Sequence, residues 1–151
     1  MTNTNSKQNI FICDIDGTLA DHAGIRSPFD ESKVHLDLPI IPVIEVVKAL
    51  RQRYKVIFIS GRTDACFSET HQWLDKHLRE PGQEGPIAIE LLMRQTGDQR
   101  RDAIIKKQIY ETHIFPHYNI LGAFDDRMQV CRMLYENEIF CFNVNQGLKE
   151  F

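Results

Sequence analysis

Residues 10–18 read IFICDIDGT, an apolar run that ends in two aspartates separated by a single residue. The run Ile10 to Cys13 predicts a buried strand, because short continuous apolar runs are typical of strands covered on both faces. Successive side chains of a strand point to opposite faces, but Gly17 permits an immediate turn. That turn would bring Asp16 over the strand end beside Asp14. The layout is typical of a functional site, and the alternative is an Asp-Gly turn that only closes the strand.

Four more short apolar runs alternate with helical patterns along the chain. Strands that alternate with helices pair in parallel and form layered domains. The sequence therefore predicts an α/β fold, a three-layer Rossmann-like domain with a central parallel five-stranded sheet. The four further strands are expected at residues 56–60, 87–93, 120–124 and 139–144.

Four amphipathic patterns between these runs predict helices. One begins at Pro42, which suits the first turn of a helix, and a second follows Asp64. A third is expected over residues 98–113 and a fourth over residues 127–136. The side chains expected to face the core are Val43, Val46, Val47 and Leu50 in the first helix, Phe67, Leu74 and Leu78 in the second, Ile105 and Ile109 in the third, and Val130 and Leu134 in the fourth.

Length and charge limit the classes of protein to which the chain can belong. Its 151 residues suffice for the core of one domain, expected at residues 9–151 after a loose polar tail at 1–8. Because that tail has no apolar stretch, we expect neither a signal peptide nor a membrane anchor. The 18 basic and 21 acidic residues give no bulk basic field, so any contact with nucleic acid must be local.

The four cysteines, Cys13, Cys66, Cys131 and Cys141, show no metal-ligand spacing, and three of them lie within apolar runs. Such cysteines are typical of reduced core residues. We therefore expect an intracellular protein, located in the cytoplasm, or in the host cytoplasm if the source is a virus.

Polar residues follow the predicted strands at their carboxyl ends. In open parallel sheets ligands bind beyond these ends, so side chains placed there are expected to meet in one crevice. The first strand ends in Asp14 and Asp16. The second ends in the triplet 60–62 (Ser-Gly-Arg), and the fourth ends in the triplet 125–127 (Asp-Asp-Arg).

Four carboxylates in one crevice would repel each other unless a cation joined them. The four are Asp14, Asp16, Asp125 and Asp126. Carboxylate oxygens without accompanying histidine or cysteine suit Mg²⁺, which takes one or two carboxylates together with a substrate phosphate. The alternative for Asp125 and Asp126 is a pair that caps the start of the following helix. Beside Asp14 and Asp16, the sequence favours the metal site.

Lys106, Arg62 and Ser60 add an ammonium, a guanidinium and a hydroxyl to the same crevice. Lys106 lies four residues after Asp102, so the two share one face of the third predicted helix. Such donors hold a dianionic phosphoryl group in line, and their combination with the carboxylates predicts phosphoryl transfer. Taken alone, Lys106 and Arg62 would each be interpreted as solvated surface residues.

A carboxylate can also act as a nucleophile. Through an aspartyl-phosphate it divides one difficult displacement into two easier ones, and Asp14 is the candidate for this role. Asp16, projecting over it, would give a proton to the leaving alcohol and then take one from the attacking water.

The motifs and their order resemble those of the haloacid dehalogenase superfamily of phosphatases. This resemblance extends over nearly the whole chain and is carried by Asp14-x-Asp16-Gly17-Thr18, Ser60 after an apolar strand, Lys106, and Asp125-Asp126. Within the superfamily, the chain resembles the 3'-phosphatase domain of bacteriophage polynucleotide kinase/phosphatase. The stretches that carry this closer resemblance are 16–20 (DGTLA), 26–30 (RSPFD), 60–62 (SGR), 97–106 (GDQRRDAIIK) and 125–130 (DDRMQV).

The resemblance implies roles for individual residues. Asp14 would be the nucleophile and Asp16 the general acid and base, and Lys106 would hold the phosphoryl oxygens with Ser60. Mg²⁺ would be held by Asp14, Asp125 and the backbone carbonyl of Asp16, with Asp126 beside them. The residues expected to bind substrate are Thr18, Arg26, Ser60, Gly61, Arg62 and Asp102.

The predicted elements leave no room for an inserted cap domain, so a haloacid dehalogenase fold with a minimal cap and an open crevice is expected. An open crevice suits a phosphate at the end of a large substrate. Together with this crevice, the resemblance implies removal of a 3'-phosphate from nucleic-acid ends during end repair. Residues 94–107 contain five basic and two acidic side chains, which either grip backbone phosphates or form a solvated helix face.

Two other functions stay open on the sequence alone. The chain would be a nucleotidase if it acted on free mononucleotides, or an inactive binding module that keeps the fold. Intact Asp14, Asp16, Lys106 and Asp125 argue against the inactive module. No Gly-x-x-x-x-Gly-Lys-Ser/Thr string occurs, so kinase activity is not expected here. The sequence leaves open whether a separate kinase or ligase of the same pathway acts with the chain. The sequence leaves open the choice between DNA and RNA ends and whether the chain forms homo-oligomers.

Overall fold

The computed structural model describes residues 6–147 and 150–151. At its centre is a five-stranded sheet with the strand order β5-β4-β1-β6-β7, in which all neighbouring strands run parallel. The predicted central parallel sheet is therefore confirmed. The strands are β1 (Gln8–Cys13), β4 (Lys55–Thr63), β5 (Glu90–Arg94), β6 (Tyr118–Asp125) and β7 (Cys141–Asn143).

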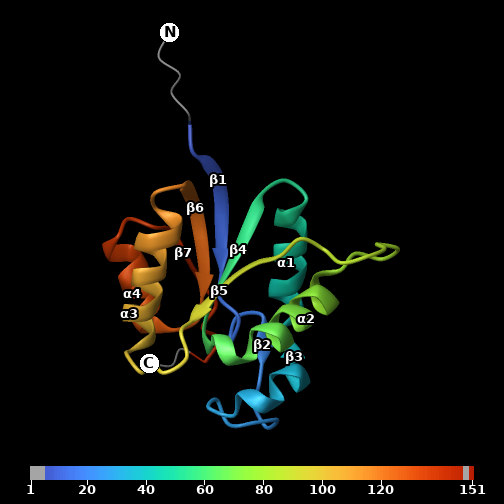
Figure 1. The fold of residues 1–151 in the computed structure, drawn as a ribbon. Helices are drawn as coiled ribbons and strands as arrows, with labels where there is room; N and C mark the ends of the chain where they lie inside the picture. Colours follow the sequence, from blue (N-terminus) through green and yellow to red (C-terminus); the bar gives the residue numbers. More distant parts are fainter. Residues whose placement is uncertain (1–5, 148–149) are drawn as a thin grey trace.

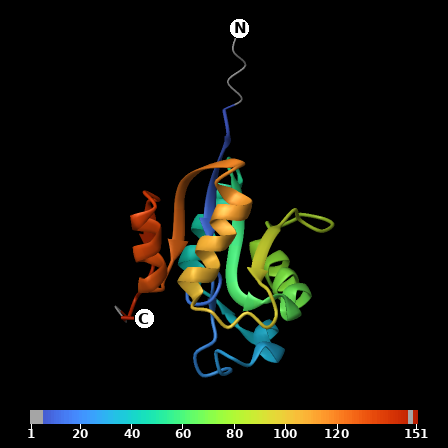
Figure 2. The same cartoon turned by 60° about the vertical axis from the view of Figure 1, so that its left-hand side comes forward.

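Two helices cover each face of the sheet, which gives the predicted three layers (Figures 1 and 2). One face packs against α1 (Ile41–Arg51) and α2 (Phe67–Leu78), and the other packs against α3 (Asp102–Ile109) and α4 (Met128–Glu136). Alternate residues of β1 and β4 serve opposite faces, so both strands are buried on both sides. Each fully buried Ile, Leu or Phe contributes about 1.5–3 kcal/mol, and this burial fixes the strand ends that carry the site.

A small segment between β1 and α1 stands where a cap would be inserted. It consists of β2 (Ala20–Asp21), the 3₁₀ helix η1 (Glu31–Leu36) and β3 (Leu38–Pro39), and β2 pairs antiparallel with β3. In Figure 1 this segment lies beyond the carboxyl ends of β1 and β4. No folded cap domain lies in this part of the described chain, which agrees with the predicted minimal cap.

The third predicted helix, residues 98–113, begins later than expected. α3 starts at Asp102, and after Ile109 it continues into a π-helical turn, η3 (Tyr110–Ile114). The residues before Asp102 form a turn instead. Gly97 has a φ of 91°, and the Asp98 carboxylate accepts the Arg100 N–H (3.2 Å), a local bond that competes with the helix.

Other differences from the sequence pattern are small. Val46 and Phe67, predicted to face the core, have exposed fractions of 48% and 42%. The buried residues of α1 are Val47, as predicted, and Ile44. The strand predicted at 87–93 begins only at Glu90, and the strand predicted at 139–144 is limited to Cys141–Asn143. Helix α2 follows Asp64 after a 3₁₀ turn, η2 (Asp64–Cys66).

All four cysteines are free thiols, and Cys13, Cys66 and Cys131 are buried. This agrees with the prediction of reduced core residues. Residues 1–5 of the predicted loose tail lie outside the described residues, and Gln8 already belongs to β1. None of the helices in the described part of the chain is long and apolar enough to span a bilayer.

Candidate active site

Asp14 follows β1 directly and is held at the centre of the strand ends. Its N–H donates to the carbonyl of Phe124 on β6 (3.0 Å), so the sheet fixes its backbone. Its two carboxylate oxygens have different partners: Oδ1 accepts from Lys106 Nζ (2.8 Å), and Oδ2 accepts from Thr18 Oγ1 (3.0 Å). The side chain of Asp14 therefore has one fixed orientation in a buried setting.

Lys106 reaches the same point from α3 and is only 2% exposed. Its Nζ lies 2.8 Å from Asp14 Oδ1, 2.7 Å from Asp125 Oδ2 and 3.4 Å from Asp102 Oδ2. Burial lowers the pKa of Lys106, but the charges of Asp125 and Asp14 outweigh it and the net shift is upward. Lys106 is therefore a fixed cation between carboxylates, and the surface interpretation is wrong.

Asp14, Asp125 and Asp126 form a group of carboxylates that each offer one oxygen within 4.8 Å of the others. Burial raises the pKa of Asp14 well above its usual range, the charge of Asp125 raises it further, and Lys106 opposes both. Burial and the charge of Asp125 also raise the pKa of Asp126. One ammonium does not balance this negative charge. Because every donor atom is a carboxylate oxygen, the group fits Mg²⁺.

Gly17 makes the approach of Asp126 possible. Its φ is 77°, a conformation that other residues rarely adopt, and a Cβ at this position would lie 2.1 Å from Asp126 Oδ2. Thr18 also approaches Asp126, with 3.4 Å between Oγ1 and Oδ1. Both residues after the second aspartate of the motif therefore serve the acidic group.

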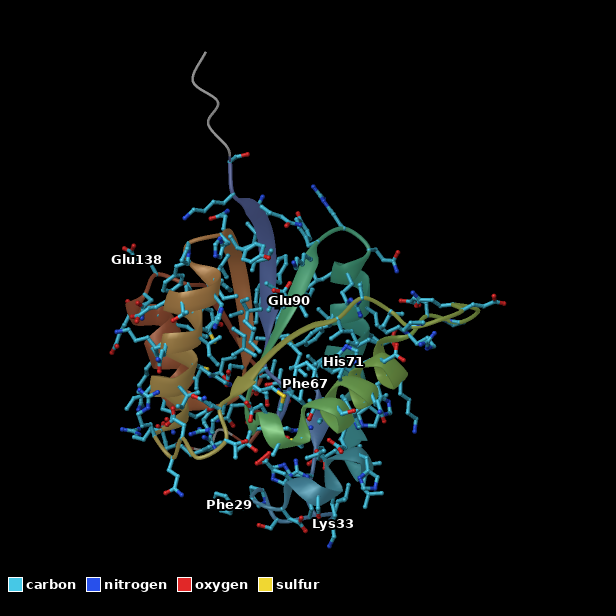
Figure 3. The ribbon with its side chains drawn as sticks, in the orientation of Figure 1. Phe29, Lys33, Phe67, His71, Glu90 and Glu138 are labelled. Atoms are coloured by element: carbon cyan, nitrogen blue, oxygen red, sulfur yellow. The ribbon has the colours of Figure 1, made fainter. Side chains whose placement is uncertain are left out.

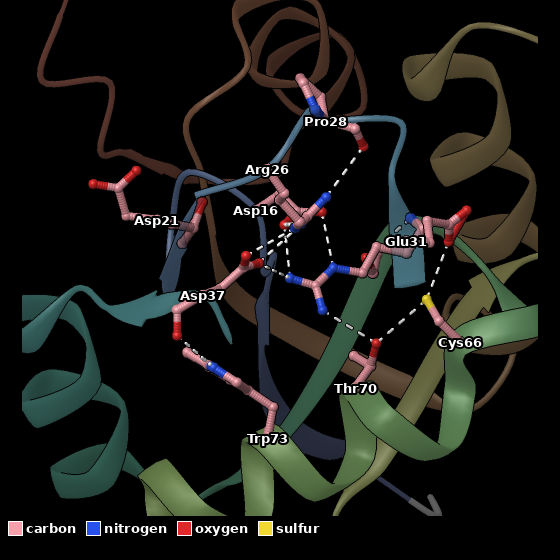
Figure 4. A network of polar contacts seen from close by, with 12 residues as sticks. Asp16, Asp21, Arg26, Pro28, Glu31, Asp37, Cys66, Thr70 and Trp73 are labelled. Carbon is pink, nitrogen blue, oxygen red and sulfur yellow. Dashed lines mark hydrogen bonds and ion pairs between the residues drawn. The ribbon is translucent and has the colours of Figure 1, made fainter. Parts of the chain in front are cut away.

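The Asp16 carboxylate is not a member of this acidic group and is held instead by two arginines, in the network of Figure 4. Arg62 donates from Nε to Asp16 Oδ2 (3.0 Å) and from Nη2 to Oδ1 (2.7 Å), and Arg26 Nη2 also donates to Oδ1 (3.1 Å). Burial alone would raise the pKa of Asp16, but the Arg62 hydrogen bonds and the charges of Arg62 and Arg26 lower it. The two aspartates of the motif thus have opposite electrostatic surroundings. Of Asp16, only the backbone carbonyl is a candidate metal ligand.

Asp37 completes this network, and the sequence pattern did not identify it. Its buried carboxylate accepts from Arg26 Nε (2.8 Å), Arg26 Nη2 (2.8 Å) and Arg62 Nη2 (2.9 Å). Its carbonyl accepts from Trp73 Nε1 on α2 (2.9 Å). Asp37 therefore partly balances the two guanidinium groups that hold Asp16, and it joins the small segment to α2 (Figure 4).

Arg62, Ser60 and Gly61 lie on β4, within a break in its pairing with β5. Ser60 pairs with Met93 and Thr63 with Arg94, so residues 61 and 62 form a bulge, a device that redirects side chains next to sites. Arg62 is only 5% exposed, which excludes a surface role. The Ser60 hydroxyl accepts the Arg62 N–H (3.1 Å) and keeps its own proton to donate.

Gly61 touches Asp102, the residue that begins α3. A Cβ at Gly61 would lie 2.2 Å from Asp102 Oδ1, so any other residue here would displace the Asp102 carboxylate. The Asp102 carboxylate oxygens lie 3.4–3.6 Å from side-chain nitrogens of three cations, Lys106, Arg94 and Arg127. Asp102 therefore sits beside Lys106 and the bulge, in contact with the chain that follows Ser60.

The basic stretch 94–107 does not form a free patch. Arg94 donates to the carbonyls of Gly61 (2.8 Å) and Asp98 (2.9 Å), and Arg100 is bound to Asp98 and Gln108. Two of the five basic residues, Arg94 and Arg100, thus fix the loop before α3, and a third, Lys106, contacts Asp14 and Asp125.

These contacts bring together every residue that the sequence predicted, in two connected halves. One half contains a held carboxylate, an ammonium and a carboxylate group that fits Mg²⁺. The other half contains a carboxylate clamped by two buried arginines. The roles predicted for the individual residues stay predictions.

Nearly the whole chain is similar to known proteins. The family model of the polynucleotide kinase PNKP phosphatase domain matches residues 8–148. A protein of Autographa californica nuclear polyhedrosis virus, named as a bifunctional polynucleotide kinase/RNA ligase, is 32% identical over 144 residues, which are 93% of this chain and 20% of that protein.

Solved structures agree with this assignment. Chains in two structures, described as the Pnkp1/Rnl/Hen1 RNA repair complex and the Pnkp1/Rnl/Hen1 complex, are 37% and 38% identical with TM-scores of 0.80 and 0.81. The matches cover 91% and 92% of this chain and 42% and 46% of those chains. The class C acid phosphatase of Bacillus anthracis with tungstate bound, at 12% identity and a TM-score of 0.56 over 95% of this chain and 72% of that chain, shares the fold.

The chain spans about a fifth of the viral relative and less than half of the two chains in the repair complexes. What it matches in each case is one part of a larger protein. The family model nevertheless extends from the first strand to the residues after β7. The chain therefore belongs to the family of polynucleotide kinase phosphatase domains, within the haloacid dehalogenase superfamily.

Proposed function

We propose that the chain is a Mg²⁺-dependent phosphomonoesterase that removes 3'-phosphate groups from nucleic-acid ends. One observation carries the proposal: Asp14 is held by Lys106 and Thr18 beside a carboxylate group that fits Mg²⁺, while Arg26 and Arg62 hold Asp16 apart from it. Two carboxylates two residues apart are thereby prepared for different chemical tasks.

In the first half of the reaction, a carboxylate oxygen of Asp14 attacks the phosphorus and forms an acyl-phosphate. The bond from phosphorus to the 3'-oxygen breaks, and Asp16 supplies the proton that this oxygen takes up. Lys106 and the Ser60 hydroxyl hold the phosphoryl oxygens, since both are buried donors: Lys106 contacts Asp14, and Ser60 lies on β4, the strand that pairs with β1. Mg²⁺, held by Asp14, Asp125, Asp126 and the carbonyl of Asp16, would supply charge neutralisation and orientation of the phosphate.

In the second half, water attacks the acyl-phosphate, phosphate leaves, and Asp14 is restored. Asp16 takes the proton from that water, so it returns to its starting state. The two arginines suit this step, because they lower the pKa of Asp16 and keep it ionised when the step begins. For the first step Asp16 must be protonated, and a phosphomonoester that enters as the monoanion can supply that proton.

The minimal cap and the family both support a nucleic-acid end as the substrate. The segment from β2 to β3 contains no folded cap domain. A phosphate at the end of a long nucleic-acid strand can therefore reach Asp14. The relatives are named as a kinase/RNA ligase and as members of an RNA repair complex. We therefore also propose that the chain acts in intracellular nucleic-acid end repair, together with a kinase or a ligase.

The substrate assignment is tested with three phosphates at equal concentration: a 3'-phosphorylated oligonucleotide, a 3'-mononucleotide and a 5'-mononucleotide. We expect the highest kcat/KM for the oligonucleotide, because only that substrate extends beyond the crevice and contacts its rim. Release of inorganic phosphate is the measurement. A preference for the 5'-mononucleotide would replace the end-repair assignment with the nucleotidase, and no release from any phosphate ester would favour the inactive module.

Metal removal is expected to abolish activity and to leave the protein folded. The acidic group lies at the strand ends and outside the two apolar clusters, so the core does not depend on a cation. Phosphate release after exhaustive chelation, circular dichroism of the same sample, and recovery on addition of Mg²⁺ are the measurements. Full activity in the chelated sample would contradict the metal requirement.

A further inference from the structure

Phe29 lies in the loop between β2 and η1 and is 92% exposed, the highest value among the large apolar side chains in the described part of the chain. Figure 3 shows Phe29 at the outer edge of this loop, on the side of the molecule where the strands end. Full burial of a phenylalanine is worth about 1.5–3 kcal/mol, so this ring forgoes a stabilising contact. Single exposed apolar residues are common, so exposure alone does not indicate a function for Phe29. A function is indicated instead by its position.

The loop that carries Phe29 is fixed. Arg26 Nη1 donates to the carbonyls of Ser27 (3.2 Å) and Pro28 (3.3 Å), and the Phe29 N–H donates to Ser27 Oγ (3.3 Å). The Asp30 N–H closes the turn by donating to the Ser27 carbonyl (3.0 Å). Phe29 is thus presented to solvent on a hydrogen-bonded turn.

The side chain that fixes this turn also holds Asp16. Arg26 donates from Nη2 to Asp16 Oδ1 (3.1 Å) and from Nη1 to the carbonyl of Pro28, the residue before Phe29. Phe29 is therefore tied by one guanidinium to the carboxylate that exchanges protons with the leaving oxygen. The position of the turn that carries the ring is thereby linked to the position of Asp16.

We propose that Phe29 is a stacking platform for the base of the nucleotide that carries the 3'-phosphate; this inference rests on the proposed function. Exposed aromatic rings bind single-stranded nucleic acids by stacking, which tolerates every base because each base has a π-face. Leu36 and Leu38 in the same segment are also exposed, but as aliphatic side chains they offer no aromatic face for stacking. The platform would favour strand ends with a base over small phosphate esters and would not select a sequence.

The proposal is tested with Phe29→Ala and Phe29→Trp on three substrates. These are a 3'-phosphorylated oligonucleotide, the same oligonucleotide with an abasic terminal nucleotide, and p-nitrophenyl phosphate. Phe29→Ala is expected to lower kcat/KM for the first by about 5- to 150-fold, mainly through KM, as removal of one stacked base would. The other two substrates are expected to change by less than about twofold. Phe29→Trp is expected to retain wild-type values.

Tyr135→Ala is the matched control, because Tyr135 is an 82% exposed aromatic near the end of α4. It is expected to change none of the three rates. An equal loss with Phe29→Ala on all three substrates would show that the residue only shapes the loop around Arg26, and no loss on any would show that the base does not reach it. Either result overturns the platform.

A second measurement separates this inference from the proposed function. The inhibition constant of a 3'-hydroxyl oligonucleotide against p-nitrophenyl phosphate hydrolysis reports base binding without requiring cleavage of a 3'-phosphate. If the wild type cleaves p-nitrophenyl phosphate but not the 3'-phosphorylated strand, the proposed function fails. The platform then stands if Phe29→Ala weakens this inhibition by about 5-fold or more and Phe29→Trp does not, and it falls if all variants are inhibited equally.

Discussion

Asp14→Asn is expected to abolish phosphatase turnover while the protein stays folded. An amide cannot form the acyl-phosphate, and loss of the nucleophile in covalent catalysis costs on the order of 10⁴- to 10⁶-fold. The amide oxygen still accepts a hydrogen bond from Lys106, which also keeps its contacts to Asp125 and Asp102. Phosphate release and the absence of a phosphorylated protein after quenching are the measurements.

The same substitution is expected to raise the Tm in metal-free buffer at neutral pH. Burial and the charge of Asp125 raise the pKa of Asp14 in the folded protein, so its ionised form destabilises the fold at any pH above the unfolded value of about 3.9. Asparagine removes that penalty. The gain in Tm is expected to shrink as the pH falls below about 4, where the carboxyl is protonated in both states.

Asp21→Asn is the matched control, because Asp21 is an exposed aspartate on β2 that accepts the Ala23 N–H (2.9 Å) and does not touch the acidic group. It is expected to retain wild-type turnover and Tm. Wild-type turnover by Asp14→Asn would exclude the covalent mechanism. A fall in its Tm at neutral pH would show that Asp14 contributes more through its hydrogen bonds than it costs by its charge.

The sequence predicts the acidic half of the site well because a general rule of parallel sheets applies. Asp14 and Asp125 follow apolar runs, and residues at the carboxyl ends of neighbouring strands must lie close together. The prediction of Lys106 needed only its helical spacing from Asp102 and a helix that packs against the sheet near these strand ends. The start of that helix was nevertheless wrong, since the pattern does not reveal that Asp98 uses its side chain to close a turn.

The clamp on Asp16 could not be predicted in the same way. Arg26 and Arg62 were expected to contact the substrate, but the structure shows that both guanidinium groups bind Asp16 and Asp37. Asp37 belongs to no motif, and its partners lie 11 and 25 positions away in the chain. Its only signal is a lone charge between Leu36 and Leu38 in a segment without clear periodicity.

Asp16, which these two arginines hold, is the site of the second large expected effect. Asp16→Asn is expected to lower the turnover of a 3'-phosphorylated strand by about a hundred- to ten-thousandfold. The loss depends on the leaving group, because an alkoxide of high pKa needs the proton and a nitrophenolate does not. With p-nitrophenyl phosphate, formation of the acyl-phosphate is expected to stay fast while its hydrolysis becomes slow. A burst of nitrophenolate equal to the enzyme concentration is the measurement, and equal losses on both leaving groups without a burst would contradict the acid and base role.

Asp16 and Asp14 are also expected to have opposite effects on the stability of the fold. Although burial raises the pKa of Asp16, its bonds to Arg62 and the two arginine charges lower it below the usual value. Its ionised form therefore stabilises the fold above the unfolded pKa of about 3.9, and that contribution is lost as the pH falls through the lower folded value. Asp16→Asn is expected to lower the Tm at neutral pH, where Asp14→Asn raises it. If both substitutions shift the Tm in the same direction in metal-free buffer, the two carboxylates do not have the opposite surroundings on which their different chemical roles depend.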